Sequence, residues 1–137
     1  TLSANALSLA AMRATLEHVM TDDAYAHMEV LAGKLAAGLQ AVVDQYGLAW
    51  HVVRVGARVE FICAPGPLRN GTEAEAAHAP ALEQAMHLAL LNRGCLIAPF
   101  HNMMLVSPAT TARQVEALCL AFEAAVASLA LGRFDVP

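Results

Sequence analysis

Charged residues are scarce in this sequence, and lysine is almost missing. Only 15% of the 137 residues are charged, whereas a typical soluble domain has about 25%. The net charge is −4, and the basic residues form no cluster along the chain. Because nucleic-acid binding depends on clustered Lys and Arg that neutralise phosphates, these features argue against DNA or RNA as a partner. The only lysine, Lys34, stands between apolar helix positions, which is typical of a surface lysine.

Long uninterrupted apolar runs are also missing, although 58% of the residues are hydrophobic. A membrane-spanning helix needs about 20 consecutive apolar residues, and here charged side chains such as Arg13, Arg93 and Glu123 interrupt every long run. We therefore expect no membrane span. Two interpretations of the apolar excess remain: an alanine-rich soluble protein, or burial against a partner or a further domain, which we favour.

Motifs for metal binding and nucleophilic catalysis are absent from the sequence. The six histidines show neither the HExxH spacing nor a grouping with cysteines, so we expect no metal site. There is no GxSxG, no Gly-rich phosphate loop and no CxxC motif. Cys63, Cys95 and Cys119 are far apart and lie among apolar residues, as buried free thiols do. Such cysteines fit a reducing compartment, and we expect a cytoplasmic protein.

Apolar residues recur with helical spacing in four segments and with strand-like patterns in four others. The expected helices cover residues 3–20, 21–47, 81–93 and the segment after Thr111, and the expected strands cover residues 50–55, 58–63, 95–98 and 103–107. Residues 64–80 are rich in Pro, Gly and polar residues, which predicts a surface loop. Helices laid on one face of a small antiparallel sheet are the natural packing for this order.

Several residues predict where these elements begin and end. Thr21 before two aspartates predicts a helix start, and Gly47 predicts a left-handed helix stop. Gly56 separates two strand candidates that we expect to form a hairpin. Thr111 and Gln114 match a capping box. We therefore predict one α+β domain over residues 1–137, with an antiparallel sheet of three to four strands.

Two short polar stretches are the candidate sites. Thr1 and Asn5 place a hydroxyl and an amide just before a helix, which suits an anion such as phosphate, although plain helix capping is the simpler interpretation. His101 and Asn102 lie in a short loop between strands, where they line a pocket or merely form a turn. Arg58 and Glu60 share a strand face, which a solvated surface explains.

Two longer segments resemble a known family. TLSANALSLAAMRATLE, residues 1–17, and LLNRGCLIAPFHNMMLVSPATT, residues 90–111, resemble the C-terminal region of class III pyridoxal-phosphate aminotransferases. Within that family they are most similar to glutamate-1-semialdehyde 2,1-aminomutases and related transaminases. The order and spacing of the segments match over nearly the whole chain.

The resemblance implies a function for the chain and roles for three residues. It implies the C-terminal part of an enzyme that moves an amino group between an amine or amino acid and a carbonyl compound, with pyridoxal phosphate as cofactor. Thr1 would contact the cofactor phosphate of the other subunit in a homodimer, and His101 and Asn102 would line the substrate pocket. The lysine that holds the cofactor and the aspartate on its ring would lie upstream. We therefore expect no catalytic residue in this chain, an apolar face that packs on the missing large domain, and no activity of the chain alone.

The sequence departs from the family pattern at two places. Ala6 replaces the usual proline, and His101 and Asn102 stand where the aminomutases have an acidic residue. The second departure favours a transaminase over an aminomutase. The chain also begins at Thr1 in a helical pattern, as if cut from a longer protein. The alternative function is a stand-alone α+β interaction or dimerisation module without catalysis.

Overall fold

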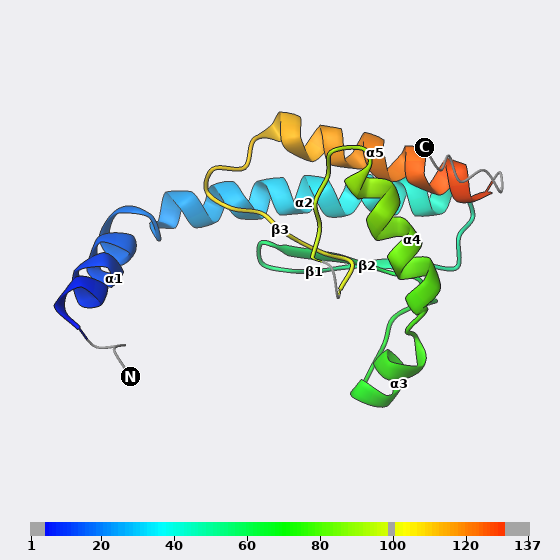
Figure 1. The fold of residues 1–137 in the computed structure, drawn as a ribbon, viewed down its shortest axis with the longest axis horizontal. Helices are drawn as coiled ribbons and strands as arrows, with labels where there is room; N and C mark the ends of the chain where they lie inside the picture. The colour runs from blue at the N-terminus through cyan, green and yellow to red at the C-terminus, as the bar shows by residue number, and fades with distance from the viewer. Residues whose placement is uncertain (1–4, 99–100, 131–137) are drawn as a thin grey trace.

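The computed structural model describes residues 5–98 and 101–130 of the chain (Figure 1). Five helices and three strands follow one another in these residues. In chain order they are α1 (Ala6–His18), α2 (Asp22–Gln45), β1 (His51–Val55), β2 (Arg58–Ile62), α3 (Gly71–Ala76), α4 (Pro80–Leu91), β3 (Met103–Leu105) and α5 (Ala112–Ala130). The α+β class predicted from the sequence is confirmed.

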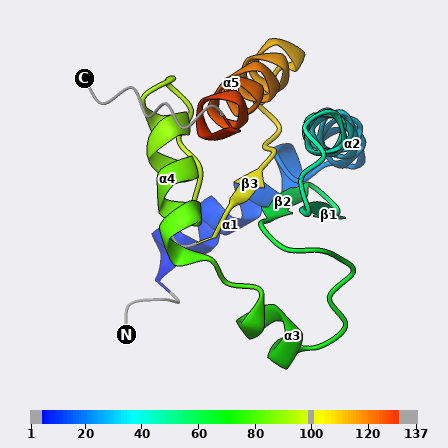
Figure 2. The same ribbon diagram turned by 90° about the vertical axis from the view of Figure 1, so that its right-hand side faces the viewer.

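The three strands form an antiparallel sheet in the order β1-β2-β3, with the long helices α2 and α5 on one face (Figure 2). In the hairpin, Val52 lies opposite Phe61, and the β2–β3 ladder pairs Val59 with Met104. Because successive side chains of a strand point to opposite faces, Val59 and Phe61 of β2 point toward α2 and α5 and are fully buried. Arg58 and Glu60 point from the opposite, open face of the sheet.

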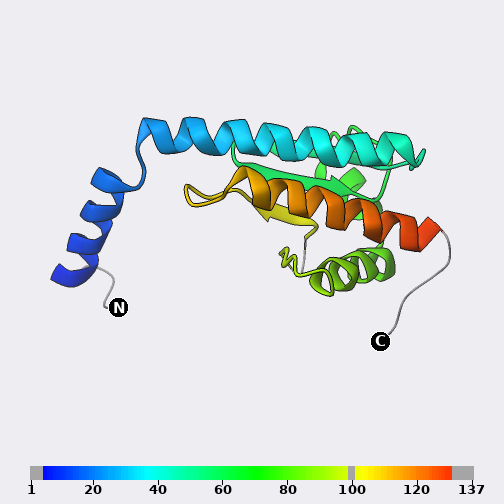
Figure 3. The same cartoon turned by 90° about the horizontal axis from the view of Figure 1, so that it is seen from above.

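The core lies between the sheet and the helices α2, α4 and α5. Phe61 of β2 packs against Phe122 of α5, with ring centroids 4.9 Å apart and the rings tilted. Leu35 and Leu39 of α2 complete this layer and are almost fully buried. Figure 3 shows α2 and α5 side by side above the sheet. The sheet is thereby held as a rigid base for the loops at its edges.

The predicted helix boundaries are largely confirmed. The side chain of Asn5 accepts a hydrogen bond from the Ser8 N–H at 2.9 Å, so α1 begins three residues later than the apolar pattern suggested. Thr21 caps α2 in the same way, and Gly47 ends it with φ of 60°. At the start of α5, the Gln114 side chain accepts a hydrogen bond from the Thr111 N–H at 2.8 Å, which confirms the capping box.

Two predicted elements were wrong. Residues 95–98 do not form a strand, because only the Ala98 N–H, which donates to the Met103 carbonyl at 3.1 Å, connects them to β3. The predicted loop 64–80 contains the short helix α3. Its signal was Asn70 with Glu73 three residues later: the Asn70 side chain accepts from the Glu73 N–H, and the Glu73 carboxylate accepts from the Arg69 N–H at 2.7 Å. Reciprocal capping of this kind stabilises a helix start within a polar stretch.

Helix α1 stands apart from the body of the domain (Figures 1 and 3). None of its 13 residues is buried by the rest of the described chain. The apolar stripe that gives this segment its helical spacing, Leu9, Met12, Leu16 and Val19, is open: Met12 and Leu16 are each 56% exposed. A helix this short gains little stability in water without a packing partner, so its exposed stripe is a surface that requires one.

Candidate functional site: a polar pocket on the open face of the sheet

A pocket of about 320 Å³ lies beside the open face of the sheet, between β2, the α3 segment and the loop before β3. Its polar lining comes from four separate parts of the chain: Arg58 and Glu60 of β2, His78 after α3, Glu83 of α4, and His101 with Asn102. The two pocket residues predicted from the sequence therefore lie in one hollow. A pocket with several converging polar side chains is the usual form of a small-molecule site.

His101 and Asn102 are adjacent but differ in their surroundings. Asn102 is only 7% exposed, and it is the one polar residue among the buried side chains of the described chain. Its backbone carbonyl accepts a hydrogen bond from the Phe61 N–H at 3.2 Å, and its side-chain Nδ2 lies 3.9 Å from Sγ of Cys63. The His101 side chain is exposed at the pocket, while its carbonyl accepts from the Met103 N–H at 2.6 Å. The turn is thus closed by backbone groups, and the His101 side chain is exposed at the pocket while the Asn102 amide is buried against Cys63.

Charges of both signs line the same hollow. Nη2 of Arg58 contacts Oε2 of Glu60 at 2.6 Å, and the exposed fractions of these side chains are 49% and 19%. Glu83 accepts a hydrogen bond from the Ala79 N–H at 3.0 Å, and its Oε1 lies 3.6 Å from Nδ1 of His78. The strand pattern alone placed Arg58 and Glu60 on a solvated face, whereas the structure places them in the lining of this pocket. Their i, i+2 spacing, which puts both side chains on one face of the strand, was the available signal.

Cys63 lies behind the amide of Asn102 and is not a reactive thiol. Burial, with a smaller contribution from the negative charge of Glu83, raises the pKa of Cys63 to about 12. A thiol that remains protonated is a poor nucleophile. Cys63 therefore acts as a packing group between the core and the Asn102 side chain.

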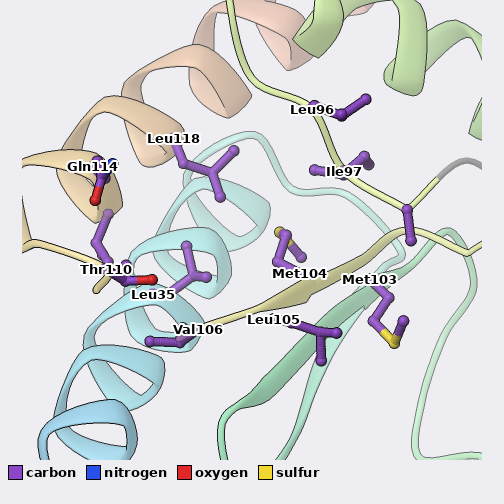
Figure 4. A pocket seen from close by; sticks show the side chains of 12 residues that line it. Leu35, Leu96, Ile97, Met103, Met104, Leu105, Val106, Thr110, Gln114 and Leu118 are labelled. Carbon is purple, nitrogen blue, oxygen red and sulfur yellow. The ribbon is translucent and has the colours of Figure 1, made fainter. Parts of the chain in front are cut away.

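A second, larger hollow of about 610 Å³ is almost entirely apolar (Figure 4). It lies between β3, the segment before it, and helices α2 and α5, and Thr110 and Gln114 are the polar residues at its border. Leu96 and Leu105 beside it are 77% and 68% exposed. This hollow offers no group that could take part in proton transfer, so the smaller polar pocket is the better candidate for chemistry. The apolar hollow instead has the character of a packing surface.

The remaining sequence-based candidates lie away from the polar pocket or outside the described residues. Thr1, the predicted phosphate contact, is not among the described residues. Lys34 is exposed on α2 and shares a separate hollow with residues of α5. Within residues 5–98 and 101–130, no three His, Cys, Asp or Glu side chains are grouped as metal ligands would be. No helix in the same ranges is both long and apolar enough to cross a membrane.

Comparisons with known proteins give consistent matches. No family model matches the chain. A glutamate-1-semialdehyde 2,1-aminomutase from Thermomicrobium roseum is 34% identical over 99 residues, which are 72% of this chain and 23% of that protein. The crystal structure of a glutamate-1-semialdehyde-aminomutase variant from Pseudomonas aeruginosa PAO1 in complex with PMP is 49% identical. It superposes with a TM-score of 0.90 over 92% of this chain and 28% of its own.

An omega-transaminase from Sphaerobacter thermophilus has the same fold, with 27% identity and a TM-score of 0.69, over 88% of this chain and 26% of its own. These matches bear out the resemblance to the C-terminal domain of class III pyridoxal-phosphate-dependent aminotransferases that the sequence predicted. Within that family the curated relatives carry the name glutamate-1-semialdehyde 2,1-aminomutase. The chain spans less than a third of the length of these relatives.

Proposed function

We propose that this chain is the small-domain part of a pyridoxal-phosphate-dependent enzyme that moves an amino group between an amine or amino acid and a carbonyl compound. The observation that carries the proposal is the 49% identity and TM-score of 0.90 to an aminomutase structure in complex with PMP. The polar pocket supports it, because the two residues that the family resemblance assigns to the substrate line one hollow.

The residues of this chain fit a supporting role toward the cofactor. When bound, pyridoxal phosphate draws electron density from the carbon that bears the amine, and the protein supplies anchoring and orientation. The only lysine, Lys34, is exposed on α2, away from the polar pocket, so the lysine that holds the cofactor must come from outside residues 1–137. The chain then contributes one wall of the substrate pocket, and Thr1 contributes a phosphate contact across a homodimer.

A role of Thr1 in phosphate binding is open to a direct test. In the full-length protein, Thr1→Ala should weaken cofactor retention roughly tenfold, since a hydrogen bond to a charged acceptor contributes about 1.5–3 kcal/mol. The fold should be unchanged. Equal cofactor affinity of variant and parent would remove Thr1 from the phosphate site.

The polar pocket favours a transaminase over an aminomutase. His101 and Asn102 present an imidazole and an amide, where the aminomutase pattern has a carboxylate. An imidazole and an amide can hydrogen-bond a substrate without adding a fixed negative charge. Asn102 is held by its backbone and by Cys63, so its amide orients a bound group, whereas the exposed His101 adjusts to it.

The partner of the exposed apolar surfaces is the rest of the same polypeptide. The stripe of α1 and the hollow near Leu96 and Leu105 are both open in this chain. Relatives of this chain are more than three times as long as the part that matches it. Packing of that missing body on these surfaces explains why 58% of the residues are hydrophobic. We further propose a homodimer in the cytoplasm, as in the sequence-based expectation.

The proposed function is tested by amino transfer in the full-length protein and its pocket variants. The parent protein, loaded with pyridoxal phosphate, should convert an amine or amino acid to the carbonyl product in the presence of an acceptor. His101→Ala and Asn102→Ala should raise KM or change substrate preference by about tenfold, the effect of one lost hydrogen bond to a charged group. The isolated chain should show no turnover.

The alternative, a stand-alone interaction or dimerisation module, predicts different results. Under this alternative, a full-length protein that contains this chain does not transfer amino groups. His101→Ala and Asn102→Ala then change only the thermal stability. If the isolated chain turned over substrate and carried a pyridoxyl adduct on Lys34, the proposal that the cofactor-binding lysine lies outside this chain would be wrong.

A further inference from the structure

Helices α2 and α5 leave a groove between their exposed sides, separate from the polar pocket. Its volume is about 380 Å³, and it is lined by Lys34, Ala112, Val115, Glu116, Cys119 and Leu120. Leu120 is 67% exposed at this groove, and Val30 of α2 is 59% exposed. Because residues four apart lie on the same face of a helix, Val30 extends the apolar surface along α2 from Lys34.

The groove and the larger apolar hollow lie on different flanks of α5. Gln114 and Leu118 line the larger hollow, whereas Glu116 and Leu120 line the groove. Residues two apart in a helix are rotated by about 200° around its axis, so these two pairs point in different directions. The buried Val115 lies between them and lines both. A body that packs on the larger hollow therefore covers a different side of α5.

The groove carries one charge of each sign, on two different helices. Lys34 of α2 and Glu116 of α5 are both exposed, and neither has an ion pair or hydrogen bond within residues 5–98 and 101–130. Burial, with a smaller contribution from the negative charge of Glu116, raises the pKa of Cys119. That carboxylate therefore acts on the interior of the groove, although it has no cation as a partner.

A groove with a cation on one wall and an anion on the other is complementary to a second copy of itself. In a twofold contact, each residue meets the same residue on the partner that its partner meets on it. Lys34 of each copy would then meet Glu116 of the other, and the two pairs would flank Leu120 and Val30 of both copies. An apolar centre with charged groups at its rim is the usual composition of a protein interface. An unrelated partner would have to supply the reversed pattern of charges, which a second copy has by symmetry.

We propose that this groove is an interface through which two copies of this chain associate, with the exposed sides of α2 and α5 in contact. The interface is additional to the homodimer proposed above and joins two such assemblies. Apart from the groove's own residues, the proposed function does not depend on it, because no residue of the groove lines the polar pocket.

Analytical ultracentrifugation of the full-length protein over a dilution series tests the interface. The parent should form an assembly of twice the mass of the Lys34→Glu variant. That variant should raise the dissociation constant of the larger assembly by about 10-fold or more, because it places like charges opposite each other at both contacts. Arg69→Glu makes the same change in charge at an exposed position before α3, outside the described lining of these hollows, and should match the parent.

A charge swap tests whether Lys34 and Glu116 meet directly. Glu116→Lys alone should weaken the association as much as Lys34→Glu does. The double variant Lys34→Glu/Glu116→Lys restores opposite charges at both contacts and should recover the mass of the parent assembly. Recovery would come from the pair itself, since both side chains are exposed and have no partner that the fold requires.

Leu120→Ala tests the apolar part of the interface and serves where a charge reversal does not fold. It should raise the dissociation constant by a few-fold, because it removes a side chain from the centre of the contact. Leu88→Ala on α4 is the matched control, since Leu88 is 51% exposed and lies outside the described lining of the groove.

Three results would overturn the inference. One is a parent protein with the same mass as Lys34→Glu at every concentration. Another is a larger assembly that neither charge reversal dissociates, which would place the contact elsewhere. The third is a double variant that unfolds at the same temperature as the parent but does not recover the larger assembly. Amino transfer is measured separately, so each of these results would leave the proposed function standing.

Discussion

Helices α1 and α5 both carry large apolar residues at helical spacing but have opposite environments. Both were predicted from helical spacing of large apolar residues, and both are present. Phe122 of α5 is fully buried against Phe61, whereas Met12 of α1 is 56% exposed. The comparison teaches that an amphipathic pattern shows that a helix face needs a partner, but it does not identify the partner. In α5 the partner is the sheet of the same domain, and in α1 it is the body that we propose to be missing.

The largest expected difference between the two helices is the loss of stability when a large apolar side chain is replaced by alanine. In the isolated chain, Phe122→Ala should lower the free energy of unfolding by about 3–5 kcal/mol, because it removes a fully buried ring. Met12→Ala on α1 is the matched control and should change it by less than about 0.5 kcal/mol. Chemical denaturation monitored by circular dichroism measures both. Similar losses for the two variants would show that α1 is packed in the isolated chain.

A smaller change in stability is expected when glycines on the two sides of α2 are replaced by alanine. A Cβ at Gly38 would lie 2.5 Å from Sγ of Cys119 on α5, whereas a Cβ at Gly33 would meet nothing within 4 Å. Gly38→Ala should therefore cost about 1–3 kcal/mol by overpacking, and Gly33→Ala should gain roughly 0.5–1 kcal/mol from helix propensity.

Thermal unfolding of the two glycine variants gives the comparison. Adding Cys119→Ala to Gly38→Ala should recover part of the loss, because it removes the sulfur that the new Cβ contacts. Equal stability of Gly33→Ala and Gly38→Ala would contradict the close approach of α2 and α5.

The smallest expected effect is the pH dependence of stability and of alkylation that comes from the three thiols. Burial raises the pKa values of Cys63, Cys95 and Cys119, and that of Cys63 reaches about 12. The folded state disfavours the Cys63 thiolate, so this contribution to stability is present below pH 9 and is lost as the pH rises toward 12. In the native protein, alkylation at pH 8 should modify Cys95 first and Cys63 last. Mass spectrometry of the time course measures the order, and rapid alkylation of Cys63 would show that the packing around this thiol is open.

The sequence predicted the elements whose signals are local. Thr21, Gly47 and Thr111 marked helix boundaries correctly, because capping depends on residues within one turn. Residues 95–98 look like a strand, but whether they pair depends on their distance from β3, which a local pattern cannot give. Short apolar runs are ambiguous for this reason.

The candidate site shows the same division between local and non-local signals. His101 and Asn102 were selected from the sequence, and the structure places them in one pocket. The sequence could not show that Asn102 is buried and His101 exposed, because that difference depends on β2 and Cys63. Nor could it bring Arg58 and Glu60 to the same pocket, since more than 40 residues separate them from the loop along the chain.

The central claim is that surfaces left open in this chain are covered by the rest of a longer polypeptide. Hydrogen–deuterium exchange of the α1 and α5 amides, in the isolated chain and in the full-length protein, tests it most directly. We predict that α5 is protected in both proteins, and that α1 exchanges freely in the isolated chain but is protected in the full-length protein. Free exchange of α1 in the full-length protein, or equal protection of α1 and α5 in the isolated chain, would contradict the account.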